Sequence, residues 1–178
     1  MRRSNALRDR LLQSTRPDHV QVDRLLSTLN LASAQDYVRF LSIHADALSQ
    51  LGNRTSLQDR ADITALMSCL ATDLEFYGAA YPRLNLTVSA DSAACQLGIS
   101  YVIRGSRLGA EVLARRVGTD APCAYLAYHL PMSWPDFVLS LEAFALNHPP
   151  ECAHEVIAGA KSAFAVFLKA AQSVEAVQ

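Results

Sequence analysis

The feature that most constrains the fold is a helical run that contains three glycines, residues 97–113 (LGISYVIRGSRLGAEVL). Apolar side chains recur in it at the spacing of three and four residues that is typical of an amphipathic helix, and no proline ends it. Its glycines are Gly98, Gly105 and Gly109. Each internal glycine costs a helix about 0.5–1 kcal/mol relative to alanine. We therefore expect a helix that bends, or one whose backbone is approached more closely than a Cβ would allow.

Two kinds of object could make this close approach. Gly105 and Gly109 lie four residues apart and share one face of the helix, so a second helix could pack its backbone against them. The alternative is a flat ligand that lies across the helix, next to exposed backbone groups and the hydroxyl of Ser106. Spacing alone favours helix packing, and the choice depends on the rest of the chain.

Composition narrows the functional classes. The 178 residues fit one domain, 1–178, and 51% of them are apolar, which is ample for one core. A net charge of −1 indicates neither nucleic acid nor an anionic membrane as a partner. No apolar run is long enough to span a bilayer, and no signal-peptide core follows Met1-Arg2-Arg3. The four cysteines show no paired spacing, so we expect reduced thiols in a cytoplasmic protein.

The rest of the chain predicts an all-α fold with short connections. Ser14 or Thr15 is expected to cap a second helix that carries Pro17 in its first turn. The longest connection is 78–90, in which the alternation of residues 84–88 is compatible with a short extended segment. Helices are expected over 5–14, 15–29, 33–51, 56–77, 92–117, from Ser133 to the Pro149-Pro150 break, and over 151–173, with a short helix between Pro122 and Pro131.

Two sets of histidines are candidates for chemistry. His19 lies on the apolar stripe of the second expected helix, where a lone histidine is most simply a core residue with its hydrogen bonds satisfied. His148, Cys152 and His154 fall close together, but two prolines intervene and no further pair of metal ligands stands nearby. An imidazole on one helix and bare backbone on another are, however, what an iron porphyrin needs on its two faces.

Two segments carry a family resemblance. Residues 97–113 resemble the distal helix of bacterial heme oxygenases, whose pattern is approximately Leu-Gly-x-x-Tyr-Val-x-Glu-Gly-Ser-x-Leu-Gly-Gly/Ala. Residues 11–26 (LLQSTRPDHVQVDRLL) resemble their proximal helix, in which Thr stands four residues before the histidine that binds iron. The later segments 133–137 (SWPDF) and 160–164 (AKSAF) are also similar, and the order is kept over nearly the whole chain.

The resemblance implies a single-domain, all-helical bundle with heme between a proximal helix and a kinked distal helix. His19 would bind the iron, Gly105 and Gly109 would let the distal helix approach the heme, and Ser106 would hold distal water. The residues implied for heme binding are His19, Thr15, Arg10, Tyr101, Gly105, Gly109 and Lys161, and those implied for catalysis are Gly105, Ser106 and Gly109.

The activity implied by the resemblance is oxidation of heme by O₂ and electrons to biliverdin, CO and iron, with heme as both substrate and cofactor. The electron donor would be a ferredoxin or a flavin reductase, and the biliverdin would serve a bacteriophytochrome or be a by-product of iron acquisition. Two alternatives remain open from the residues. One is a heme sensor or carrier on the same fold that does not degrade heme, and the other is a helical interaction module without heme.

Two departures from the family pattern keep the first alternative open. Leu12 stands where the family usually has Arg or Lys, seven residues before the iron ligand, so a contact to a heme propionate is lost or is supplied by Arg10. Arg104 stands where Glu is common, and we expect it to reverse a surface ion pair or to change the docking of a reductase. Ala110 replaces a further glycine, as in related bacterial enzymes.

Overall fold

The computed structural model describes residues 6–84 and 90–175, and within these ranges it contains helices and connections but no strand. This confirms the all-α prediction; the extended segment expected around 84–88 falls mostly outside the described residues. No helix in the described ranges is long and apolar enough to cross a membrane. The elements are α1 (Ala6–Leu26), α2 (Ala34–Leu51), η1 (Gly52–Arg54), α3 (Leu57–Phe76), α4 (Ala93–Ser106), η2 (Arg107–Gly109), α5 (Ala110–Ala114), α6 (Ala124–Ala127), α7 (Trp134–Asn147) and α8 (Cys152–Glu175), of which η1 and η2 are 3₁₀ turns.

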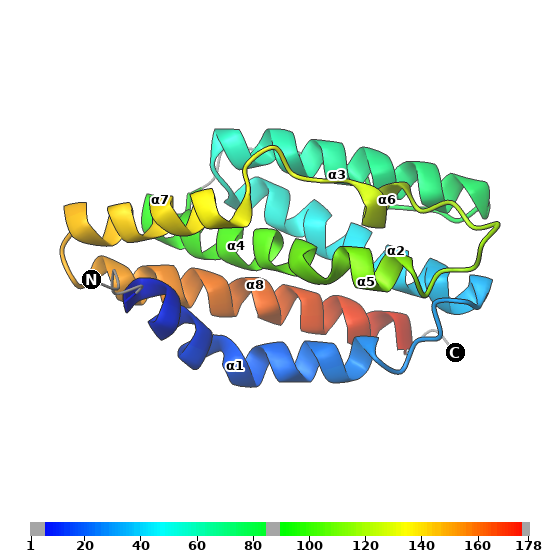
Figure 1. Ribbon diagram of the computed structural model, residues 1–178, viewed down its shortest axis with the longest axis horizontal. Coiled ribbons are helices and arrows are strands. Elements are labelled where there is room, and N and C mark those ends of the chain that lie inside the picture. Colours follow the sequence, from blue (N-terminus) through cyan, green and yellow to red (C-terminus); the bar gives the residue numbers. More distant parts are fainter. Residues whose placement is uncertain (1–5, 85–89, 176–178) are drawn as a thin grey trace.

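The C-terminal helix α8 is the element around which the others are arranged. It packs against α4, α1 and α2, and in Figure 1 it runs between α1 on one side and α4 with α5 on the other. Its buried side is lined with small residues, so neighbouring helices can approach it closely. These residues are Ala153, Ala160, Ala163, Ala170 and Ala171.

Three predicted helix starts are confirmed by their caps. Ser56, Ser92 and Ser133 each have extended backbone angles, and each hydroxyl accepts the backbone N–H three residues later. Such a cap is typically worth about 1 kcal/mol, because it satisfies a donor that the first helical turn leaves unpaired. The starts of α3, α4 and α7 are therefore determined by local sequence.

The prediction of two helices over 5–14 and 15–29 was wrong, because α1 continues through Pro17. The hydroxyl of Thr15 donates to the carbonyl of Leu11 at 2.8 Å and caps no helix start. An internal proline costs a helix about 3 kcal/mol, and packing of buried side chains on both sides of Pro17, such as Leu11 and Val22, offsets that cost. The helix changes direction along its length, as Figure 1 shows.

The N-terminus of α1 is held by a carboxylate from α7. Glu142 accepts the backbone N–H of Arg8 at 2.9 Å and that of Leu7 at 3.3 Å. Both donors belong to the first turn, where helical N–H groups have no partner within the helix and a negative charge is favourable. Glu142 therefore links α7 to the start of α1.

Replacing Glu142 by alanine is expected to lower the free energy of unfolding by about 1 kcal/mol, because two partly buried helix donors lose their acceptor. Glu142→Gln, which keeps an acceptor oxygen but loses the charge, should lower it by roughly half as much. Urea unfolding at pH 7 measures both effects. Glu151→Gln is the control at an exposed position, and equal midpoints for all the variants would contradict this role.

Candidate functional site

The glycines of the 97–113 run have different surroundings. Gly98 lies where α4 crosses α8, and a Cβ added to it would stand 1.9 Å from the carbonyl oxygen of Val156. The contact is reciprocal, since a Cβ on Gly159 of α8 would stand 2.1 Å from the carbonyl oxygen of Cys95. Close helix packing is therefore the correct interpretation for Gly98.

Gly105 and Gly109 are not used in this way. A Cβ on Gly105 would come no closer than 3.7 Å to the ring of Trp134, and a Cβ on Gly109 would meet nothing within 4 Å. Neither residue has a positive φ, so the backbone conformation does not require glycine at either position. Packing within the described chain therefore leaves these two glycines unexplained, and the ligand interpretation stays open for them.

The helix breaks where these glycines lie. α4 ends at Ser106, the next three residues form the 3₁₀ turn η2, and α5 runs only from Ala110 to Ala114. This confirms the expected bend and shortens the helix that was expected to reach 117. Ser106 is exposed at the break, and its hydroxyl donates to the carbonyl of Ile103 at 2.7 Å. We call residues 93–114 the glycine helix.

Apolar side chains are exposed on the same face of the glycine helix. Leu108 and Val112 are 60% and 63% exposed. Leu108 follows Gly105 by three residues, Val112 follows Gly109 by three, and the two pairs are offset by four residues, so all four positions lie near one side of the helix. Exposed apolar groups gathered on one face are typical of a binding surface. This face is therefore suited to a flat apolar ligand.

His19 is not a core residue, which corrects the simplest interpretation of this histidine. Its side chain on α1 is 58% exposed, and the ring lies edge-on to Phe164 of α8 with centroids 5.6 Å apart. Its Nδ1 lies 3.0 Å from a carboxylate oxygen of Asp23. Because a carboxylate accepts hydrogen bonds, Nδ1 carries a proton, and in the neutral imidazole Nε2 has the lone pair. Within the described residues Nε2 has no hydrogen bond, an arrangement typical of metal-binding histidines.

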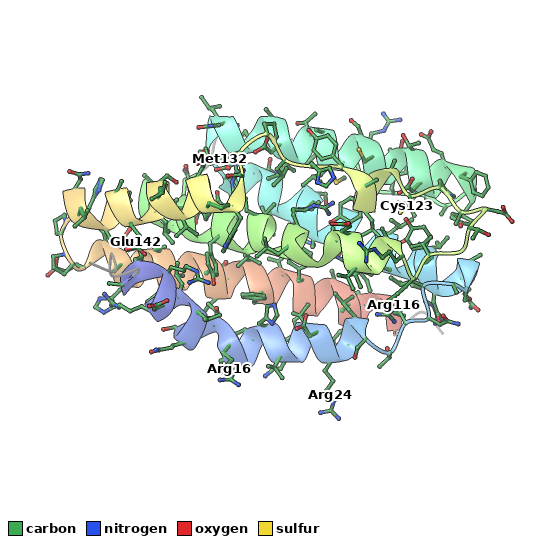
Figure 2. All side chains as sticks on the ribbon, viewed as in Figure 1. Arg16, Arg24, Arg116, Cys123, Met132 and Glu142 are labelled. Carbon is green, nitrogen blue, oxygen red and sulfur yellow. The ribbon has the colours of Figure 1, made fainter. Side chains whose placement is uncertain are left out.

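The helix of His19 and the glycine helix lie on either side of α8. Phe164 of α8 contacts His19, and one helical turn earlier on α8 Lys161 is exposed. On the opposite side of α1, Arg16 and Arg24 point away from α8, as Figure 2 shows. The polar, charged side of α1 therefore faces solvent.

No protein-family model matches the sequence, and no curated protein matches it significantly. The structure superposes on the NO- and CO-bound heme oxygenase from Neisseria meningitidis with a TM-score of 0.73 and 23% sequence identity. The match covers 94% of this chain and 91% of that one. The chain has the heme oxygenase fold.

In this heme oxygenase fold, Thr15 and Tyr101 are both buried. The hydroxyl of Thr15 is used within α1, one turn before His19. Tyr101 is 9% exposed and packs against Trp134 with ring centroids 5.6 Å apart. Burial raises the pKa of Tyr101, so its phenol stays protonated and can donate a hydrogen bond.

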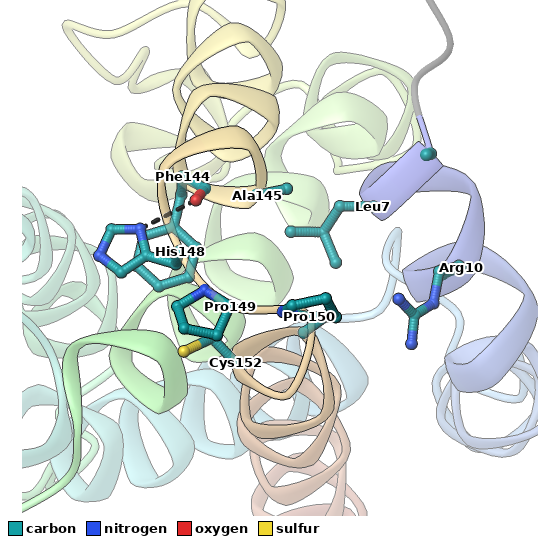
Figure 3. Close-up of a pocket in the computed structure, with 10 residues that line it drawn as sticks. Leu7, Arg10, Phe144, Ala145, His148, Pro149, Pro150 and Cys152 are labelled. Atoms are coloured by element: carbon teal, nitrogen blue, oxygen red, sulfur yellow. Dashed lines mark hydrogen bonds between the residues drawn. The ribbon is translucent and has the colours of Figure 1, made fainter.

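Arg10 lies more than two turns before His19 on α1, beside a small cavity of about 170 Å³ at the turn between α7 and α8. Figure 3 shows it facing Pro150, across the cavity from His148. The ring of His148 stacks on Phe144, and its Nδ1 bonds the Phe144 carbonyl at 2.9 Å. The described part of the chain holds no group of three side chains that could bind a metal ion. A propionate contact by Arg10 stays a prediction.

Arg104 is buried, so the expectation of a surface charge that changes reductase docking was wrong. Its side chain is 5% exposed, and Nη2 lies 2.8 Å from Asp59 and 2.7 Å from Asp62 of α3. Asp59 also accepts from the hydroxyl of Ser100 at 2.7 Å. Arg104 therefore joins α4 to α3 immediately before Gly105, inside the molecule.

His44 of α2, unlike His19, is buried, and sequence analysis did not single it out as a site residue. It is 6% exposed, its Nδ1 donates to the Phe40 carbonyl at 2.8 Å, and three aromatic rings surround it. Burial, with a smaller contribution from the nearby Arg107 guanidinium, lowers the pKa of His44 to about 4, although the hydrogen bond to the Phe40 carbonyl acts in the opposite direction. His44 is therefore neutral at physiological pH.

The lowered pKa of His44 predicts that the folded protein loses stability in acid. Between pH 6.5 and about 4 the unfolded chain binds a proton at His44 that the folded chain does not, so stability falls as the pH drops through this window. We expect the shift to remove about 2 kcal/mol between pH 7 and pH 5. Urea unfolding at both pH values should show this loss in the unmodified protein and in the exposed control His129→Gln, but not in His44→Gln. Equal pH dependence in all three would contradict the assignment.

Proposed function

We propose that this chain is a heme oxygenase, which cleaves heme with O₂ and electrons to biliverdin, CO and iron. The observation that carries the proposal is the exposed imidazole of His19 on α1, oriented by a carboxylate, and the helix break at which a Cβ added to Gly109 would meet no atom within 4 Å agrees with it. The shared fold adds support, because it belongs to a protein that binds heme with NO or CO. The electron donor would be a ferredoxin or a flavin reductase in the cytoplasm, and the biliverdin could serve a bacteriophytochrome.

The residues of α1 fit the iron of a bound heme. His19 offers Nε2, and Asp23 holds the ring by its Nδ1 proton, which fixes the tautomer and increases the basicity of the ligand. Phe164 limits rotation of the ring from the side of α8. When bound, heme supplies the redox-active iron and also the porphyrin ring that is oxidised. A neutral histidine ligand favours oxidation of the porphyrin ring over the O–O cleavage that a thiolate ligand promotes.

The glycine helix fits the opposite face of the heme. Gly105 and Gly109 carry no side chain that would keep the backbone away from a bound heme, and the exposed Leu108 and Val112 would offer it apolar contacts. Because the hydroxyl hydrogen of Ser106 is donated to Ile103, its oxygen keeps lone pairs that can accept from a water molecule. Ser106 would therefore hold distal water from which a proton can move during the reaction.

The contacts to the propionates are the weakest part of the match. Lys161 is exposed on α8, one turn before Phe164, and its ammonium group would be the candidate partner of a propionate. Leu12, at the position that is basic in relatives, is 53% exposed and offers no charge. This observation favours the second candidate, a heme carrier or sensor that binds heme without turning it over.

An absorption time course separates the candidates. The purified protein receives one equivalent of hemin in air, then ascorbate, with catalase present to remove free peroxide. Decay of the Soret band with growth of a biliverdin band is the expected result. A stable heme spectrum that is reduced and binds CO would indicate the carrier, and absence of any Soret shift would contradict both heme functions.

A further inference from the structure

Arg107 lies at the break of the glycine helix and is not used in the proposed reaction. It is the first residue of η2, two residues from both Gly105 and Gly109. At about 100–120° of rotation per residue, its side chain leaves the helix on the side opposite these glycines. Arg107 therefore extends away from the proposed heme site, towards α6.

The guanidinium binds the C-terminal end of α6. Its Nη2 donates to the carbonyls of Tyr125 at 2.7 Å and Tyr128 at 3.1 Å, and its carbon lies 4.7 Å from the centroid of the Tyr125 ring. The last carbonyls of a helix have no partner within it and carry partial negative charge. A cation at this position is stabilised by the helix carbonyls and also by its stacking on the Tyr125 ring.

The other end of α6 is held by Asp73 of α3, a side chain with no exposed surface. One carboxylate oxygen accepts the N–H of Ala124 and the other accepts the N–H of Tyr125, both at 2.9 Å. A helix of four residues is not stable alone, so these two charged side chains hold it in place. We call Asp73, α6 and Arg107 the strap.

We propose that Arg107 is a positioning residue for the reaction, because the strap sets where the glycine helix breaks and so where Ser106 and Gly109 stand. This inference rests on the proposed function. Without the strap, nothing in the sequence 106–110 prevents a regular helix, since it contains no proline. Converting the three residues of η2 from 3₁₀ to α geometry would rotate the following residues by about 60° and shift them by about 1.5 Å.

The first test uses the protein without heme. Hydrogen exchange of residues 105–112 should change by about tenfold or more in Arg107→Met and in Asp73→Asn, becoming faster if the segment loosens and slower if it becomes regular helix. Arg115→Met is the matched control, since Arg115 is exposed and pairs with Glu111. Exchange within about twofold of the unmodified protein in both strap variants would overturn the inference. Should Arg107→Met not fold, Arg107→Lys keeps the charge without the planar donors and replaces it.

The second test uses the hemin-loaded protein. The pH midpoint of its alkaline spectral transition reports the surroundings of the distal face, and both strap variants should shift it by about one pH unit, whereas Arg115→Met should not. A purely structural role would lower stability and leave this midpoint unchanged, which would overturn the positioning role. Failure of the unmodified protein to bind hemin overturns the proposed function instead, so the two failures are distinguishable.

Discussion

Replacing His19 by alanine is expected to weaken hemin binding by about a hundredfold or more and to remove the spectrum of a histidine-ligated heme. The reason is that Nε2 of this exposed imidazole is the nitrogen that we assign to the iron. The stability of the protein without heme should stay nearly unchanged, because the side chain is 58% exposed. Titration with hemin, followed at the Soret band, measures the affinity.

Two further variants are expected to weaken hemin binding less than His19→Ala does. Asp23→Asn keeps a hydrogen-bond acceptor beside Nδ1 but loses the charge, so its affinity should fall by about tenfold. His154→Ala removes an exposed histidine on α8 and should bind hemin as the unmodified protein does. A normal titration and spectrum for His19→Ala would show that the ligand is elsewhere.

The second large effect is a loss of stability on alanine substitution, and it is expected for one glycine of the glycine helix but not for another. Gly98→Ala is expected to lower the free energy of unfolding by more than about 3 kcal/mol, or to prevent folding, because the new Cβ would stand 1.9 Å from the Val156 carbonyl oxygen and 2.8 Å from the Ala160 nitrogen. These are backbone atoms of α8, so relief requires the two helices to separate.

Gly109→Ala should have the opposite effect on stability. Its Cβ meets no atom within 4 Å, and alanine is the better helix former, so stability should be unchanged or higher by up to about 1 kcal/mol. Hemin affinity should nevertheless fall, because the methyl group faces the proposed heme site. Urea unfolding and hemin titration of both variants provide the comparison. Equal stabilities for Gly98→Ala and Gly109→Ala would contradict these packing assignments.

Local signals in the sequence predicted much of the fold. The helix starts at Ser56, Ser92 and Ser133 were predicted correctly because a cap depends on residues within one turn. The break at Ser14 or Thr15, before Pro17, was predicted on the same local grounds and was wrong, because packing of α1 on α8 determines whether the helix continues. Local sequence does not contain that information.

The site depends on contacts between distant residues, so only part of it was predictable. Gly98 and Gly109 lie in the same helical run of the sequence, and they differ because backbone atoms of Val156 and Ala160 in α8 stand against Gly98, whereas Gly109 lies in the turn η2 with free space beside it. Arg104 could be identified as buried only once Asp59 and Asp62 of α3 were placed beside it. The resemblance to heme oxygenases selected His19 and the glycines by pattern, and the roles of these residues in heme binding stay predictions.

The central claim is that the chain cleaves heme, and product analysis after a single turnover tests it most directly. The hemin-loaded protein is mixed with excess reductant in air with catalase present, and the tetrapyrrole products and CO are quantified. We expect one biliverdin and one CO for each heme consumed. Heme recovered intact, or bleached without biliverdin and CO, would contradict it.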